Sequence, residues 1–192
     1  MRIMRKLTVC TFVALLAFAG PAAAQSTNFG LGAFAGVSLP TGDYGDAAEL
    51  GFAGGLDLFY PLGMSGLSWL STASVSAHSV DDPDADGGFL FIPLLTGLRY
   101  DIAAGPVGVF VNGQAGAIFN KGPEGDFFGV AVDSDWSTEF GFALGGGIQA
   151  TENIYAGVKY YPLGNQEFEW ENGAMQDLDV SFLDIYVGFG VR

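Results

Sequence analysis

An alternation of apolar residues with small or polar ones runs through most of residues 140–160 and favours β-structure for this stretch. The alternation continues on both sides of a short polar connection, Thr151-Glu152-Asn153. Its apolar members are Phe140, Phe142, Leu144 and Ile148 before the connection and Ile154, Ala156, Val158 and Tyr160 after it. A period of two places these residues on one face of a strand, and a short polar turn between two such runs is typical of a hairpin. The sequence therefore predicts two antiparallel strands with one apolar face and one face of small or polar residues.

The first 24 residues have the pattern of a secretory signal peptide. A basic start is followed by an apolar run at residues 7–20 and by the small residues Ala22, Ala23 and Ala24. The apolar run is shorter than the ~20 residues that a spanning helix needs. We expect cleavage after Ala24, which leaves residues 25–192 as a single mature domain.

The composition of the mature domain combines strong acidity with a high apolar content. Four basic residues remain against all 21 acidic ones, a net charge of −17, and the single cysteine lies within the signal peptide. This balance argues against nucleic-acid binding, because phosphates require Lys and Arg. A β-barrel in lipid reconciles acidity with apolarity, since acids occupy the loops and apolar side chains face the membrane. We expect no cofactor.

The same alternation recurs along the rest of the mature domain. Six further strands are predicted at about residues 28–39, 51–60, 67–80, 89–100, 107–119 and 180–191. The connections alternate in length along the chain: they are long at 40–50, 81–88, 120–137 and 162–179 and short at 61–66, 101–106 and 151–153. An up-and-down barrel places all the long connections at one rim, as in outer-membrane barrels with short periplasmic turns. We predict an all-β fold, an eight-stranded antiparallel up-and-down transmembrane β-barrel in the cell outer membrane.

Two segments carry a resemblance to a known family. Residues 36–45, GVSLPTGDYG, and residues 92–100, IPLLTGLRY, resemble the small eight-stranded outer-membrane barrels of Gram-negative bacteria. These are the outer-membrane protein A and X type, within the outer membrane protein beta-barrel domain family. The resemblance covers the mature chain and implies contact with outer-membrane lipid and lipopolysaccharide.

Charged residues on the non-apolar faces are the first candidate site. They are Asp57, Arg99, Glu139, Lys159 and Asp184. An eight-stranded barrel is just wide enough for side chains to fill it, and charges there need partners. We expect a lumen polar network in which Lys159 pairs with Asp184 from the neighbouring strand. The network is either a plug, which we favour, or the gate of a narrow diffusion channel.

The acidic loop contains half of a calcium-binding motif. Residues 82–87 read Asp-Pro-Asp-Ala-Asp-Gly, but the twelfth position of the motif, where a glutamate is required, is Pro93. We therefore favour a solvated loop in which divalent cations are held loosely, without a specific metal site.

His78, the single histidine, is the second candidate. It lies near the outer end of a predicted strand with Ser76 on the same face, and lipid-A-modifying barrels place a histidine near the outer rim. Catalysis by a nucleophile requires a base, a nucleophile and an acid in contact, and no companion motif is present. We expect a rim residue and no enzyme.

Aromatic residues fall into two groups. One lies near strand ends on the apolar faces, as interfacial girdles do: Tyr60, Trp69, Tyr100, Phe119 and Tyr160. The other lies in the two longest loops and forms either an adhesive surface or internal packing: Phe127, Phe128, Trp136, Phe168 and Trp170.

The sequence thus favours a structural or surface-interaction role, in envelope integrity or adhesion, through the long acidic extracellular loops. A porin-like narrow channel, a lipid-A-modifying rim enzyme and a soluble barrel with its apolar face turned inward remain alternatives.

Overall fold

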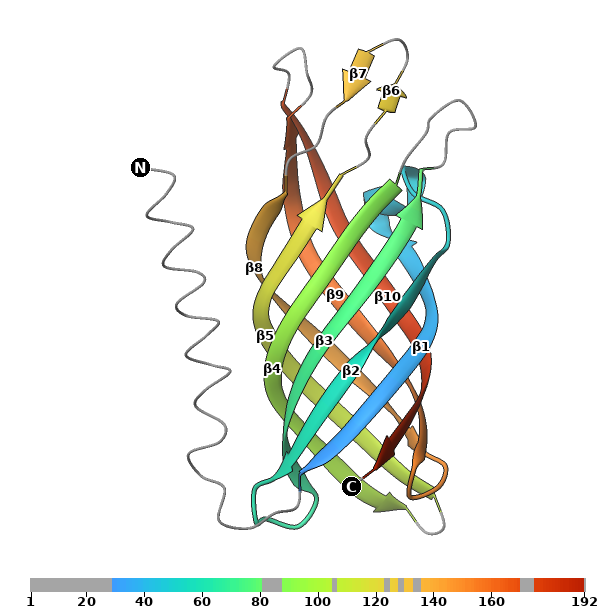
Figure 1. The fold of residues 1–192 in the computed structure, drawn as a ribbon, viewed down its shortest axis with the longest axis vertical. Helices are drawn as coiled ribbons and strands as arrows, with labels where there is room; N and C mark the ends of the chain where they lie inside the picture. Colours follow the sequence, from blue (N-terminus) through green and yellow to red (C-terminus); the bar gives the residue numbers. More distant parts are fainter. Residues whose placement is uncertain are drawn as a thin grey trace.

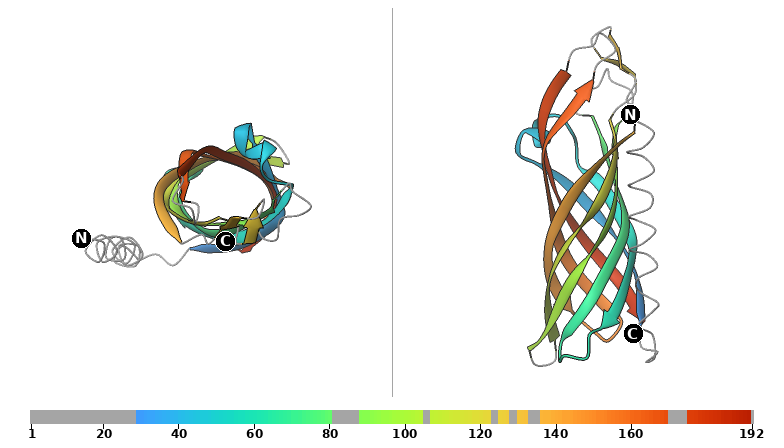
Figure 2. Two further views of the ribbon diagram at one scale, coloured as in Figure 1. Left: turned by 90° about the horizontal axis from the view of Figure 1, so that it is seen from above. Right: turned by 90° about the vertical axis from the view of Figure 1, so that its left-hand side faces the viewer.

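Eight strands form a closed barrel in the computed structural model, which describes residues 29–80, 88–104, 107–122, 125–127, 130–132, 136–169 and 175–191. The barrel strands are β1 (Gly30–Thr41), β2 (Gly51–Pro61), β3 (Leu67–Ser79), β4 (Gly88–Ala104), β5 (Val107–Lys121), β8 (Ser137–Gln149), β9 (Ile154–Glu169) and β10 (Met175–Val191). Their order around the ring is β1-β10-β9-β8-β5-β4-β3-β2, and all neighbours are antiparallel. The ring is seen end-on in Figure 2. The predicted fold class is confirmed, whereas the predicted signal peptide lies outside the described residues.

The two ends of the barrel carry different kinds of connection. The short turns at 62–66 and 150–153 lie at one end, together with the end of β10 (Figure 1). The opposite end carries the 3-10 helix η2 (Gly42–Asp46) and a ribbon made of β6 (Gly125–Phe127) and β7 (Val130–Val132). No helix in the described ranges is long and apolar enough to cross a membrane. We call the first end periplasmic and the second end outer, because outer-membrane barrels keep their short turns on the periplasmic side.

The β8–β9 hairpin has the predicted turn. The N–H of Ala150 donates to the C=O of Ile154 over 2.9 Å. The N–H of Ile154 donates to the Thr151 hydroxyl over 3.0 Å. These bonds give partners to backbone N–H groups at the connection 150–153 that would otherwise lack one within the turn.

The connection predicted at 162–179 is largely strand. β9 continues to Glu169 and β10 begins at Met175. Val180 is opposite Gly164 and Ser181 is opposite Pro162, so Leu163 is an extra residue on β9. Such a bulge absorbs the interruption that Pro162 makes in the alternation, and the hairpin continues beyond it. The ribbon of β6 and β7 likewise occupies part of the loop predicted at 120–137.

The outward face of the barrel carries an exposed apolar band. Phe140 is 79% exposed, Phe52 60% and Leu144 59%. Similar side chains are exposed on all eight strands. Water-soluble proteins rarely expose a continuous apolar surface of this size, whereas a membrane barrel requires one. The protein is therefore an outer-membrane barrel, and the soluble alternative is wrong.

The lumen is filled by inward side chains in three layers. The periplasmic layer holds Phe59, Arg99, Phe110 and Tyr155. The polar layer above it holds Ser38, Asp57, Thr72, Ser76, Gln114, Lys159 and Asp184. The aromatic layer nearest the outer end holds Tyr44, His78, Phe89, Phe91, Leu95, Ile118, Tyr161, Val180 and Phe182. All of these side chains are less than 9% exposed, so the barrel has a packed interior.

Candidate functional site

Four of the five charged residues predicted for the lumen are buried there. Arg99 and Asp184 are each 1% exposed, Lys159 is 2% exposed and Asp57 is 4% exposed. Glu139 shares the inward face but is only half-buried, because it lies near the outer end of β8, opposite Ile118. The four buried residues are two cations and two anions, so their formal charges cancel.

The Thr72 hydroxyl is the centre of the polar layer. It donates to Asp57 Oδ1 over 2.6 Å and accepts from Gln114 Nε2 over 2.9 Å. Lys159 Nζ donates to the same hydroxyl over 3.3 Å. The second oxygen of Asp57 accepts from the Tyr155 hydroxyl over 3.1 Å. The carboxylate of Asp57 thus has a donor for each oxygen, which offsets the cost of burying its charge.

Asp184 is held by hydroxyls rather than by a cation. Ser38 donates to its Oδ1 over 2.6 Å and Ser76 donates to its Oδ2 over 3.2 Å. Lys159 is opposite Asp184 in the register, but no ion pair within 4.0 Å joins them in the described part of the chain. Lys159 Nζ instead contacts the Thr72 hydroxyl, which donates to Asp57. The lysine is therefore linked to Asp57 through Thr72 and lies next to Asp184 in the register.

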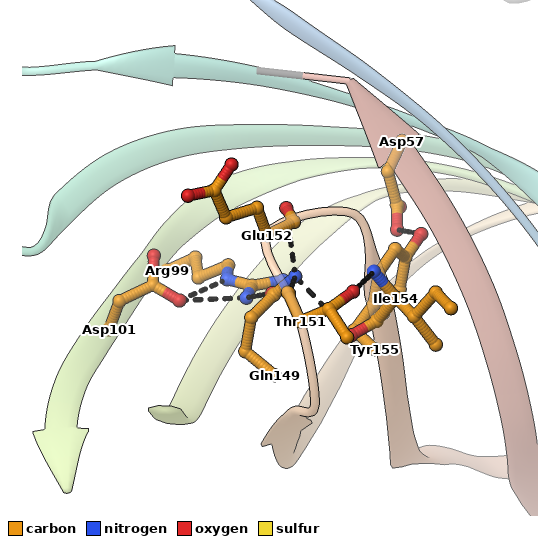
Figure 3. A network of polar contacts seen from close by, with 8 residues as sticks. All are labelled: Asp57, Arg99, Asp101, Gln149, Thr151, Glu152, Ile154 and Tyr155. Atoms are coloured by element: carbon orange, nitrogen blue, oxygen red, sulfur yellow. Dashed lines mark hydrogen bonds and ion pairs between the residues drawn. The ribbon is translucent and has the colours of Figure 1, made fainter. Parts of the chain in front are cut away.

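Arg99 organises the periplasmic layer (Figure 3). Its Nε and Nη2 donate to Asp101 Oδ1 over 2.9 and 2.7 Å, and Nη2 also donates to Gln149 Oε1 over 3.0 Å. Its guanidinium lies 3.7 Å from the ring centre of Phe110, a cation–π contact. Gln149 Nε2 donates to the C=O of Thr151 over 2.8 Å. Arg99 therefore links the lumen to the β8–β9 turn through Gln149, in a planar geometry that lysine could not reproduce.

The aromatic layer closes the outer half of the lumen. Tyr161 stacks on Phe182 with ring centres 4.6 Å apart. Tyr44, which η2 places over the barrel end, meets Phe89 edge-on at 5.1 Å. Burial raises the pKa of the Tyr44 hydroxyl, which keeps it neutral. Sequence reasoning missed this layer because barrel lumens are usually polar, so an apolar residue on the inward face of β4, such as Leu95, only blurs the alternation of that strand.

His78 lies at the outer end of β3, where we expected a rim residue, and its side chain turns inward into the aromatic layer. Its side chain is 3% exposed, and its ring centre lies 5.4 Å from that of Tyr44. Its Nδ1 lies 3.3 Å from the C=O of Glu49. Among the described residues His78 has no hydrogen bond to a serine or a carboxylate, and Ser76 bonds to Asp184 instead. Inward packing against Tyr44 explains the burial of His78.

The other sequence candidates are placed only in part. The half calcium motif at 82–87 lies outside the described residues, within which no group of three or more His, Cys, Asp or Glu could hold a metal. Tyr60 and Trp69 are opposite each other near the periplasmic end, where Tyr100 is 47% exposed. Trp136 is 53% exposed near the outer end. The side chains of Phe127, Phe128, Phe168 and Trp170 lie outside the described part.

Inward side chains are almost fully buried at three levels of the lumen. Arg99 in the periplasmic layer, Lys159 in the polar layer and Phe91 in the aromatic layer are each at most 2% exposed. A pore wide enough for hydrated ions would expose side chains at every level. The buried carboxylates accept hydrogen bonds from hydroxyl groups, and Arg99 pairs with Asp101.

Comparisons with known proteins identify the fold. No protein-family model matches the sequence, and no curated protein matches it. Neisserial surface protein A is 18% identical with a TM-score of 0.57, over 85% of this chain and 96% of that chain. The attachment invasion locus protein Ail of Yersinia pestis is 16% identical with a TM-score of 0.48, over 85% and 96%. The N-terminal barrel domain of Pseudomonas aeruginosa OprF is 13% identical with a TM-score of 0.46, over 84% and 97%. The fold of this chain is that of the small eight-stranded outer-membrane β-barrels.

Proposed function

We propose that this protein is a non-conducting outer-membrane barrel with a structural and surface-interaction role, in which binding takes place at the outer rim. The observation that supports the proposal is the packed lumen, in which three successive layers of side chains fill the cross-section. A barrel of eight strands has room for side chains or for one small ligand. Here side chains take that room, so the surface available to a partner is the outer end.

The charge of the outer end indicates the class of partner. Seventeen of the 21 acidic residues lie in segments 42–50, 81–87, 121–139 and 162–180, which join or extend the outer ends of the strands, and these segments contain one basic residue, Lys121. A rim of this sign attracts cationic surfaces and repels polyanions. We infer that it binds a partner with a basic surface, and that divalent cations link it to the phosphates of the surrounding lipopolysaccharide.

Conductance in planar bilayers tests the sealed lumen. The refolded mature chain should give no steady single-channel steps under a voltage at which an open porin, measured in the same bilayer, conducts. Regular steps of constant size from the refolded chain would contradict the proposal and would favour the porin-like alternative.

Binding to a charged probe tests the rim. Proteoliposomes carrying the barrel should bind immobilised polylysine and not heparin, with an affinity that falls as salt is raised past physiological strength. Neutralising Asp43, Asp46 and Glu49 as D43N, D46N and E49Q should weaken binding. The control E152Q removes one acid from the periplasmic turn and should leave binding unchanged. Equal binding by the triple variant and the wild type would refute the role of these rim acids.

A further inference from the structure

A groove of about 600 Å³ crosses the outward face of the barrel over β1, β10, β9 and β8. Two rows of outward residues border it, each with one residue from each strand in register. One row runs from Ala35 on β1 to Ile148 on β8, and the other runs from Val37 to Gly146. Every outward side chain in both rows is aliphatic or absent, so the groove offers no polar group to a ligand.

The wall is thin beneath the groove. Between the two outward rows lies one inward row, in which Tyr186 is flanked by the glycines Gly36, Gly157 and Gly147. A Cβ on Gly157 would lie 2.8 Å from the Tyr186 Oη and 3.0 Å from its Cζ. The Tyr186 ring therefore rests directly on the backbone, and at Ala35, Ala156 and Gly146 the outward side is nearly bare as well. The groove is a consequence of small residues on both faces.

The dimensions of the groove discriminate between occupants. Its two rows are two residues apart along each strand, about 7 Å, and three strand spacings give it a length of about 14 Å. An α-helix is about 10–12 Å across, and stacked sheets need about 10 Å between them. A helix or strand of a partner protein is thus too wide to enter, whereas a single methylene chain fits between the rows.

The groove begins at the periplasmic side of the apolar band. Ile148 is one residue from the periplasmic end of β8, and Val37 is seven residues from the start of β1. With a rise of about 3.3 Å per residue and a tilt of about 40°, the groove climbs to about 18 Å above the periplasmic end, within an apolar band about 25 Å tall. The groove is therefore continuous with the hydrocarbon of the periplasmic leaflet.

We propose that this groove binds one acyl chain of a phospholipid from the periplasmic leaflet. The chain lies across the four strands, between the aliphatic rows, with its headgroup at the β8–β9 turn. Within a membrane, association depends on van der Waals contact, and an unfilled groove would lose those contacts along its whole length. A flexible chain fills it, and the stiff wall of the barrel fixes that chain in one direction.

Photo-crosslinking tests the proposal directly. The refolded barrel is placed in phosphatidylethanolamine and phosphatidylglycerol vesicles that contain a phospholipid with a diazirine in the middle of its acyl chain, and crosslinked residues are located by mass spectrometry. Crosslinks in the wild type should concentrate on the groove, at Ala35, Ala156 and their neighbours. A spread proportional to exposure around all eight strands would overturn the proposal, as would a covalent dimer joined through this face.

A filling variant and a matched control sharpen the result. The double variant A35L/A156L adds apolar bulk to the groove, so crosslinking there should fall to the level of the opposite wall. The control A73L makes the same change at an exposed alanine on β3, across the ring from β9, and should leave groove crosslinking unchanged. Unaltered crosslinking in A35L/A156L would overturn the proposal, and the wild-type map decides even if that variant fails to fold.

Discussion

Replacing the buried lysine of the polar layer tests how the lumen charges are balanced. In K159M the apolar stem is kept and the ammonium is lost, so Asp57 and Asp184 remain buried with hydroxyl donors alone. Removing one partner of a buried charged group costs about 3–5 kcal/mol, because the remaining charge is uncompensated. We expect the free energy of unfolding of K159M to fall by that amount. Urea titration of the barrel in phospholipid vesicles, followed by tryptophan fluorescence, measures the change.

Adding D57N or D184N to K159M tests which of the two carboxylates Lys159 stabilises more. Because Lys159 shares the Thr72 hydroxyl with Asp57, and no ion pair within 4.0 Å joins it to Asp184 among the described residues, K159M/D57N should recover more stability than K159M/D184N. Neutralising all three residues should recover most of the loss, since an uncharged polar layer has no charge to compensate. A K159M barrel within about 1 kcal/mol of the wild type would refute the reasoning, as would a larger recovery from D184N than from D57N.

Two further predictions concern packing. In G188A the new Cβ would collide with the Tyr155 ring, and overpacking should lower the free energy of unfolding by about 1–3 kcal/mol. The control G54A should be neutral, because its Cβ would have no atom nearer than 3.4 Å. Equal effects of the two variants in the same urea titration would count against the packing argument. In Y44F the lost hydroxyl has no hydrogen-bond partner among the described residues, so stability should hold or rise by up to about 1 kcal/mol. Burial raises the pKa of Tyr44, so above about pH 10 the tyrosine ionises in the unfolded chain and stays neutral in the folded one, and the wild type loses stability. Y44F should lose less stability over the same pH range. If Y44F loses as much stability at pH 11 as the wild type, burial of the Tyr44 hydroxyl is not the cause.

The parts of the fold that follow a two-residue period could be predicted from the sequence. Asp57 and Arg99 lie on the inward face because each is flanked by outward apolar residues, and side-chain direction in a strand alternates without exception unless a bulge intervenes. The sorting of long and short connections likewise gave the orientation. These features depend on local order along one strand or on the lengths between strands.

Features that depend on contacts between distant strands could not be predicted. Parity alone does not show that Phe91 and Phe182, 91 residues apart in sequence, meet in one aromatic layer inside the lumen. The contact of Lys159 with Thr72, which links the lysine to Asp57 instead of the adjacent Asp184, depends on how side chains extend across the lumen. The bulge at Leu163 depends on the pairing of β9 with β10, which overrides the local signal of Pro162.

The closing seam between β1 and β10 has a consequence for how the chain folds. Every other barrel ladder joins strands that are consecutive in sequence, apart from the β6–β7 ribbon between β5 and β8, but this one pairs Leu31 with Val191 through to Thr41 with Ser181. The bond from Ser38 to Asp184 spans 146 residues and crosses the same seam. Contacts this distant in sequence form late, because ordering the intervening chain costs entropy that only the finished ladder repays. Each hairpin needs only contacts between neighbouring strands. Closure of the barrel and the bond between Ser38 and Asp184 both require the first and last strands to pair, so they form together.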